Sequence, residues 1–347
     1  MRKLIGGNFG FKTFYGKKNY FNKKKELNNF YPSGRSAFIA TVKYLFKKNN
    51  IEKIEIPCYL CESIVHSLIQ NNIKYSLYSI DMKFNMAPEL KKNTLTLLVN
   101  FFGMNHTSIN KIIKNNYNHK FIVDDSHSFL NTQFNFKNYK NCEVFFSLRK
   151  FVPIIAGKSS VKNESKKINN NYKKFFQDNI NLKKIRFNYF KFPFKNIDKN
   201  FEEKMISKFQ NHEKILKNIF SSKTPSFVMD YLNSIDWLKV KKIRQRNFKY
   251  LSNKLKKKFE IVNICNSNKN IIPLFLLLKI NKERDRIREY LFSKRILAPI
   301  HWPKNKIINY KNFSNERKMK ESFLSIPIDQ RYNLDDMEYI FKKLNKV

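Results

Sequence analysis

Apolar and polar residues alternate along the first half of the chain in blocks that suit helices and strands in turn. SGRSAFIATVKYLFKKN begins with small polar residues and then places Ala37, Val42 and Leu45 on a helical period, and CESIVHSLIQN predicts a second helix. Short apolar runs predict strands at IEKIEIP, KYSLYSI, TLTLLVNFFG, KFIVDD and CEVFFSL. This alternation predicts an α/β fold with a largely parallel sheet.

The middle of the chain loses this pattern. Residues 163–200 are polar and rich in Lys and Asn, which predicts loops and irregular structure. Helical patterns then cover roughly 200–221 and 236–258.

The remaining residues predict a second unit. Strands in EIVNI and IIPLFLLLKI are followed by the helix ERDRIREYLFSK and by a terminal helix after Asn333. A length of 347 residues suits two domains, and the composition changes near Asp236. We therefore expect a large domain over residues 1–235 and a small C-terminal α+β domain over residues 236–347.

Composition indicates a globular protein, because 42% of the residues are hydrophobic and 15% are aromatic. No apolar run reaches the length of about 18 residues that a membrane-spanning helix needs. The start MRKLIGGNFGFKTF has no continuous apolar stretch of the kind found in signal peptides. The expected location is therefore the cytoplasm.

The net charge is +42, from 69 Lys and Arg against 27 Asp and Glu. A charge of this size favours nucleic acid, an anionic membrane surface or another anionic partner. The lysines are spread along the whole chain, however, and no zinc-finger or RNA-binding signature accompanies them. We interpret the charge as compositional drift and expect no specific nucleic-acid partner, although a basic nucleic-acid binder stays an alternative.

Cys58 and Cys61 have the CxxC spacing of many zinc sites. A structural zinc site needs a second ligand pair, and neither a CxxH nor an HxxxH partner follows. We therefore interpret the two residues as buried thiols in a strand-to-helix turn and expect no metal.

Polar residues stand where predicted strands end or a helix begins. Ser33-Gly34-Arg35-Ser36 opens a helix, which makes either a phosphate cradle or a simple helix cap. Asp124 and Asp125 follow a buried strand, with His127 close behind. Lys150 follows another apolar strand, where loss of water would lower the pKa of its amine, as nucleophilic chemistry requires. In a parallel sheet such strand ends gather ligands.

Together these elements resemble the DegT/StrS sugar-nucleotide aminotransferases, which have the aspartate-aminotransferase fold (type I) of pyridoxal-phosphate (PLP) enzymes. The resemblance runs nearly end to end, through SGRSA, IPCYLCESI, VDDSHSF, SLRKFVP, IDWxxxxxIRQRN, ILAPIHWP and LSIPIDQRYNLDDMEYI. It implies a large domain with a mainly parallel, seven-stranded type of sheet flanked by helices, a small C-terminal domain, and PLP as the cofactor.

The resemblance also implies catalytic roles. Lys150 would carry PLP as a Schiff base and then move a proton as general base and acid. Asp124 would keep the pyridine nitrogen protonated, and His127 would lie near the ring oxygen or the ring face.

Further residues would bind the cofactor and the substrate. The phosphate turn of Gly34, Arg35 and Ser36, together with Ser147, would hold the cofactor's phosphate group. Tyr59 would stack on the ring, with Cys61 as the alternative at that position. His301 and Trp302 would approach the mouth of the site from the small domain and contact the substrate.

The chain departs from the family pattern near the cofactor. Gly157 is followed by Lys158 where the family commonly has a pair of glycines. Asp125 is an unusual second acid and would itself be the ring partner if the register were shifted by one. Asn100 stands where many relatives have His.

The implied activity is that of a homodimeric aminotransferase, which moves an amino group from glutamate onto a keto-sugar nucleotide in surface-polysaccharide or lipopolysaccharide synthesis. One alternative is another PLP reaction on the same scaffold, such as dehydration of the sugar. Relatives that dehydrate tend to replace the lysine, so Lys150 favours transamination. The other alternative is a non-catalytic relative that acts as a binding or regulatory protein.

Overall fold

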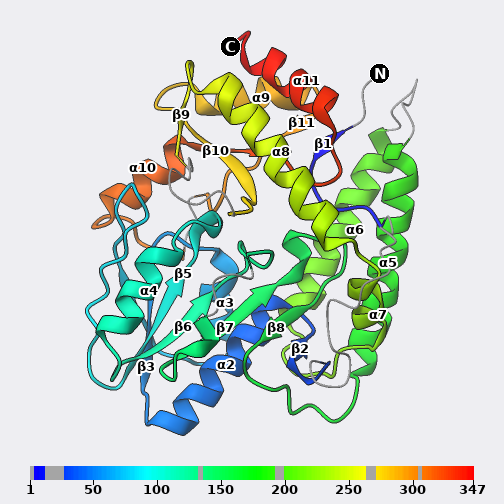
Figure 1. The fold of residues 1–347 in the computed structure, drawn as a ribbon. Coiled ribbons are helices and arrows are strands. Elements are labelled where there is room, and N and C mark those ends of the chain that lie inside the picture. The colour runs from blue at the N-terminus through cyan, green and yellow to red at the C-terminus, as the bar shows by residue number, and fades with distance from the viewer. Residues whose placement is uncertain (1–3, 12–26, 132–135, 192–198, 263–270, 304–306) are drawn as a thin grey trace.

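A computed structural model describes residues 4–11, 27–131, 136–191, 199–262, 271–303 and 307–347 of the chain (Figure 1). The fourth cysteine, Cys265, and the end of the predicted EIVNI strand lie outside these ranges. No helix within them is long and apolar enough to cross a bilayer.

A seven-stranded sheet forms the centre of the fold, in the order β2-β8-β7-β6-β5-β3-β4. Neighbouring strands from β4 to β7 pair in parallel, whereas β8 is antiparallel to both β7 and β2. The strands are β2 (Phe30–Tyr31), β3 (Lys53–Pro57), β4 (Tyr75–Tyr78), β5 (Thr94–Val99), β6 (Lys120–Asp124), β7 (Cys142–Ser147) and β8 (Gly157–Ser159). The expected α/β class with a mainly parallel sheet of seven strands is confirmed.

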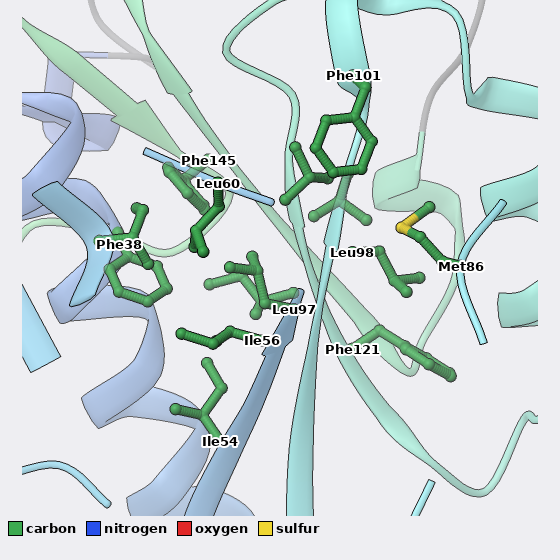
Figure 2. Close-up of a cluster of buried hydrophobic side chains, with 14 of the residues drawn as sticks. Phe38, Ile54, Ile56, Leu60, Met86, Leu97, Leu98, Phe101, Phe121 and Phe145 are labelled. Atoms are coloured by element: carbon green, nitrogen blue, oxygen red, sulfur yellow. The ribbon is translucent and has the colours of Figure 1, made fainter. Parts of the chain in front are cut away.

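Apolar side chains cover both faces of this sheet, as expected of parallel strands that are buried on both sides. In β5 every residue is buried, and Leu97 and Leu98 point to opposite faces. Figure 2 shows Leu97 beside Ile54 and Ile56 of β3 and Phe38, whereas Leu98 points away toward Phe121.

Helices flank the sheet, and the first of them, α2 (Gly34–Asn49), packs against β6, β7 and β8 (Figure 1). The helices of this part are α2 (Gly34–Asn49), α3 (Glu62–Gln70), α4 (His106–Asn115), α5 (Asn170–Lys191), α6 (Lys199–Lys217) and α7 (Phe227–Asn233). Cys58 is buried directly after β3 and Cys61 stands at the N-cap of α3, so the two free thiols lie in a strand-to-helix turn as predicted. The prediction that both are buried is wrong for Cys61, which is only partly buried.

The C-terminal part has its own antiparallel sheet, β12-β10-β9, and its own apolar core. Its elements are α8 (Trp237–Leu255), β9 (Glu260–Ile261), β10 (Phe275–Lys279), α9 (Arg284–Ser293), β11 (Ile296–Leu297), α10 (Ser314–Ser322), β12 (Phe323–Pro327) and α11 (Leu334–Leu344). The N-terminal strand β1 (Ile5–Gly6) pairs with β11, and Ile5 belongs to this core. Asp236 caps α8, and a domain boundary there stays a prediction.

The expectation of loops over residues 163–200 is wrong, because α5 fills most of this range. Its buried face carries Tyr172, Phe175 and Phe176 at helical spacing. These side chains belong to the apolar core that also contains Trp237. The abundance of Lys and Asn on the other faces of the helix hides this short apolar stripe. Packing of the stripe, rather than helix propensity, accounts for the helix.

Lys183 is an unusual member of α5, because its side chain is buried and its amine donates a hydrogen bond to the carbonyl of Pro153 at 2.5 Å. Burial, together with the nearby charge of Arg149, lowers the pKa of this lysine from the usual 10.5 to about 7. The folded protein thus binds fewer protons than the unfolded chain between about pH 7 and pH 10.5, so this group makes stability rise with pH across that window.

Replacement of Lys183 by methionine is expected to stabilise the protein at pH 7 and to flatten this rise. The substitution removes the free-energy cost of burying this amine, which is on the order of a few kcal/mol. The loss of the hydrogen bond to the Pro153 carbonyl offsets part of this gain. Thermal melting between pH 6.5 and 9.5 measures both effects, with Lys184→Met as the control because Lys184 is exposed on the same helix. If the melting temperature rose with pH equally steeply in wild type and in Lys183→Met, the lowered pKa assigned to Lys183 would be contradicted.

Candidate active site at the carboxyl end of the sheet

Most of the predicted site residues meet in one cavity at the carboxyl ends of β6 and β7. We call it the sheet-edge cavity, and its free volume is about 50 Å³. The predicted residues that line it are Gly34, Arg35, Asp124, His127, Ser147, Lys150 and Trp302. Segments far apart in the sequence thus supply one site, as expected at the strand ends of an α/β sheet.

The N-terminus of α2 forms one wall of this cavity. Ser33 has an extended backbone, and its Oγ accepts a hydrogen bond from the N–H of Ser36, so the helix starts at Gly34. A side chain at Gly34 would meet the Cβ of Ser147 at 2.7 Å, and one at Gly157 would meet the carbonyl of Ser33 at 2.1 Å. Glycine at these two positions therefore allows the first residues of α2 to contact β7 and β8 directly. The first N–H groups and the positive end of the helix dipole favour an anion here.

Lys150 ends a short 3-10 turn, Leu148–Lys150, that follows β7 directly. Burial lowers the pKa of its amine, and the repulsion from Arg149 adds to this, while Cys61 and Asp124 oppose it. Burial also raises the pKa of Asp124, although the N–H of Ser126 at 3.0 Å and the charge of Lys150 act the other way. The cavity thus holds an amine whose pKa is lowered and a carboxyl group whose pKa is raised, with Ser126 and Lys150 opposing the rise at Asp124.

Asp124 and Asp125 point to different surroundings. Asp124 lines the sheet-edge cavity, whereas Asp125 is buried behind it and accepts a hydrogen bond from Nδ2 of Asn100 at 2.6 Å. Burial raises the pKa of Asp125 to about 8. Asn100 also binds the backbone N–H of Asn105 through its Oδ1, so it belongs to this inner network. The geometry therefore favours Asp124 over Asp125 as the acid that meets a ligand.

His127 is buried and neutral, because burial and the charge of Lys150 hold its pKa well below the usual value. The N–H of Phe102 donates to its Nδ1 at 3.2 Å, which leaves the proton on Nε2. The ring of Trp302 stacks on His127 with centroids 5.5 Å apart and an angle of 10° between the planes. Trp302 has a φ of 53°, a strained value for a residue with a large side chain. A flat ligand that is to stack on the face of His127 that Trp302 covers must displace this indole.

Ser36, Tyr59 and His301 were predicted at the site but lie outside the lining of this cavity. Ser36 is buried, and its hydroxyl donates to the carbonyl of Ile219 at 2.7 Å. Tyr59 is also fully buried, and its hydroxyl donates to the carbonyl of His301 at 3.3 Å. Cys61, the alternative to Tyr59 for stacking, does line the cavity.

His301 lines a second and much larger cavity of about 1090 Å³, which we call the inter-domain cavity because residues on both sides of the predicted boundary at Asp236 line it. Lys150 and Arg149 line both cavities, so the two adjoin at the candidate active site. Basic side chains outnumber acidic ones on its wall, and those that line it are Arg149, Lys150, Arg186, Lys214, Lys217, Arg244, Arg288 and Arg331, against Glu213, Glu289 and Asp329. A cavity of this size and charge suits an anionic small molecule.

Sequence reasoning assigned no role to Arg149 or Glu213, which lie at the same place. Glu213, on α6, binds Arg35 at 2.7 Å and Arg149 at 2.5 Å. The position of Arg149 in the sequence could have indicated a role at the site, because it stands next to Lys150 at the end of an apolar strand. Glu213 had none, since it is one acid on a helix of mixed charge.

Sequence comparison gives no relative for this chain, since no protein-family model matches it and neither does any curated protein. Comparison of structures does find similar folds. Spr1654 of Streptococcus pneumoniae, a candidate sugar aminotransferase, superposes in its PLP form with a TM-score of 0.66 at 11% identity, over 98% of this chain and 97% of that one.

Two further solved structures show the same likeness. PseC of Helicobacter pylori, an aminotransferase of pseudaminic acid biosynthesis, has a TM-score of 0.63 at 12% identity and covers 99% of both chains. The GDP-4-keto-6-deoxy-D-mannose-3-dehydratase of E. coli, solved with hydrated PLP, has a TM-score of 0.60 at 16% identity, over 91% of this chain and 86% of that one. The protein therefore has the fold of these sugar aminotransferases and of the related dehydratase, that is, fold type I of the PLP-dependent enzymes.

Proposed function

We propose that the protein is a PLP-dependent aminotransferase that acts on a keto-sugar carried by a nucleotide. The observation that carries the proposal is the meeting of Lys150, Asp124 and the start of α2 in one cavity. An amine, a carboxylate and an anion site are what a pyridine aldehyde with a phosphate group requires. The fold of the sugar aminotransferases supports this choice.

The residues present fit PLP. The start of α2 and Ser147 would hold the phosphate group, Asp124 the protonated ring nitrogen, and Lys150 the aldehyde carbon. When bound, PLP supplies the electron sink for reactions at the carbon that bears the amino group. The N–H on Nε2 of His127 is a donor suited to the ring oxygen. The lowered pKa of Lys150 favours an amine that accepts a proton and returns it.

The inter-domain cavity supports a nucleotide sugar as the substrate. Its basic wall would bind the diphosphate, and Lys150 stands where it meets the sheet-edge cavity. The sugar would thus lie deep, next to Lys150, with the nucleotide farther out and His301 and Trp302 in contact with the substrate. Glutamate as the amino donor, a cytoplasmic homodimer and a role in surface-polysaccharide synthesis are further parts of this proposal.

Dehydration of the sugar is the second candidate, because a PLP-bound dehydratase of a keto-sugar nucleotide has the same fold. Lys150 argues for amino transfer, since its amine would be the group that moves a proton between the carbon that bears the amino group and the cofactor. Incubation with glutamate distinguishes the two reactions, because only amino transfer leaves an aminated sugar as the product.

The substrate class is tested by two half-reactions. Glutamate alone is expected to convert the bound cofactor to its amine form, which absorbance spectra follow, and a keto-sugar nucleotide is expected to restore it. The matching free keto-sugar should restore it far more slowly, because contacts to the nucleotide contribute to positioning the reacting carbon. Equal rates for the two sugars would rule out the nucleotide-sugar assignment and leave amino transfer standing. A spectrum that glutamate does not change would favour a binding or regulatory protein.

A further inference from the structure

A carboxylate joins two arginines beside the candidate phosphate site. Arg35 is the second residue of α2, Arg149 precedes Lys150, and Glu213 reaches both from α6. One oxygen of Glu213 is 2.7 Å from Nη2 of Arg35, and the other is 2.5 Å from Nη1 of Arg149. We call these three side chains the Arg–Glu–Arg bridge.

The bridge stands where the two cavities meet. Arg35 lines the sheet-edge cavity and Glu213 lines the inter-domain cavity, whereas Arg149 lines both. Arg35 is also the residue next to Gly34, whose Cα lies against Ser147. Two guanidinium groups and a helix N-terminus therefore converge on one place.

The charges of the bridge depend on each other. Arg35 is only 7% exposed, and burial and the charge of Arg149 lower its pKa, while Glu213 raises it. Two like charges this close, with Arg35 buried and Arg149 partly buried, would be costly without a counter-ion. Glu213 is 45% exposed, so its side chain has room to leave the arginines toward water.

A phosphate group can bind the two arginines as this carboxylate does, and it has more charge and more acceptor oxygens. It would also gain the N–H groups at the start of α2, which the Glu213 carboxylate does not contact in the structure. A phosphate ester that reaches this place can therefore take over both arginines, and the Glu213 side chain then moves into solvent.

From these contacts we infer that Glu213 competes with a phosphate group for Arg35 and Arg149 and so limits the affinity of the protein for its phosphorylated ligand. That the ligand is PLP rests on the proposed function. The competition itself rests only on the bridge, and inorganic phosphate tests it independently.

The experiment compares wild type, Glu213→Gln and Glu289→Gln. Glu289 is a matched control, because it lines the same inter-domain cavity and is exposed, and the change removes the same charge. Equilibrium titration at low ionic strength measures the Kd of PLP and of pyridoxal, which has the aldehyde but no phosphate. Calorimetry measures the Kd of inorganic phosphate, and that of UDP on protein loaded with PLP.

Glu213→Gln is expected to lower the Kd of PLP and of inorganic phosphate about tenfold, because the amide no longer neutralises the arginines. Pyridoxal binding to Glu213→Gln, and the binding of PLP and of inorganic phosphate to Glu289→Gln, should stay as in wild type. Should Glu213→Gln fail to fold, Glu213→Asp provides the test, because its shorter side chain keeps the charge but cannot span both arginines. It should also tighten phosphate, by a smaller factor.

Three results would overturn the inference. The first is a Kd of PLP and of phosphate that is unchanged or higher in Glu213→Gln than in wild type. The second is an equal gain in affinity for pyridoxal. The third is a gain in affinity for UDP alone, which would assign the arginines to the substrate. A wild type that binds phosphate but never binds PLP would instead contradict the proposed function and leave the competition intact.

Discussion

Lys150→Ala is expected to abolish covalent attachment of PLP and to lower amino transfer by at least about a thousandfold. In wild type, borohydride should fix the cofactor to the peptide that contains Lys150, because this amine lines the sheet-edge cavity together with Asp124 and has a lowered pKa. Absorbance of the purified protein and peptide mass spectrometry measure the attachment.

The matched controls are two buried lysines, Lys158 on β8 and Lys183 on α5. Alanine at either position should leave the label on Lys150. Lys183 also has a low pKa, but its amine donates to the carbonyl of Pro153 and it lines neither of the two cavities. Attachment at Lys158 in wild type would show that the lysine motif is misaligned.

Asp124→Asn is expected to leave PLP binding largely intact and to lower turnover by about a hundredfold or more. An amide cannot keep the ring nitrogen protonated, so the cofactor would lose its capacity to accept electrons. Steady-state rates with glutamate, together with the Kd of PLP, separate the loss of turnover from a loss of binding.

Asp125→Asn should have a much smaller effect, for a reason that the structure supplies. With a pKa of about 8, the Asp125 side chain is mostly neutral at pH 7, so an amide of the same shape changes little charge. Its oxygen can still accept from Asn100. If Asp125→Asn were the more damaging change, the ring partner would be Asp125 and our register would be one residue off.

Local patterns account for most of the strands and helices that build the site. Helices α2, α3, α8, α9 and α11 and strands β3 to β7 form where period and capping residues predict them. Asp124 and Ser147, which end β6 and β7, and Asn100, which follows β5, therefore lie at one sheet edge, as parallel pairing requires. Helix α5 was missed because its apolar stripe is short and only its contact with the core distinguishes it from a polar loop.

Contacts between distant segments decided the rest. The sequence by itself determined the α/β class, the strand-end position of Lys150 and the motif resemblance, because each depends on neighbours within a few residues. Only the tertiary structure decided that Asp124 faces the cavity while Asp125 faces Asn100, and that Tyr59 lies behind the site. It alone brought Glu213 from α6 onto Arg35, 178 positions away. Such pairs have no local signal, since the free energy that selects them comes from burial and charge in the assembled fold.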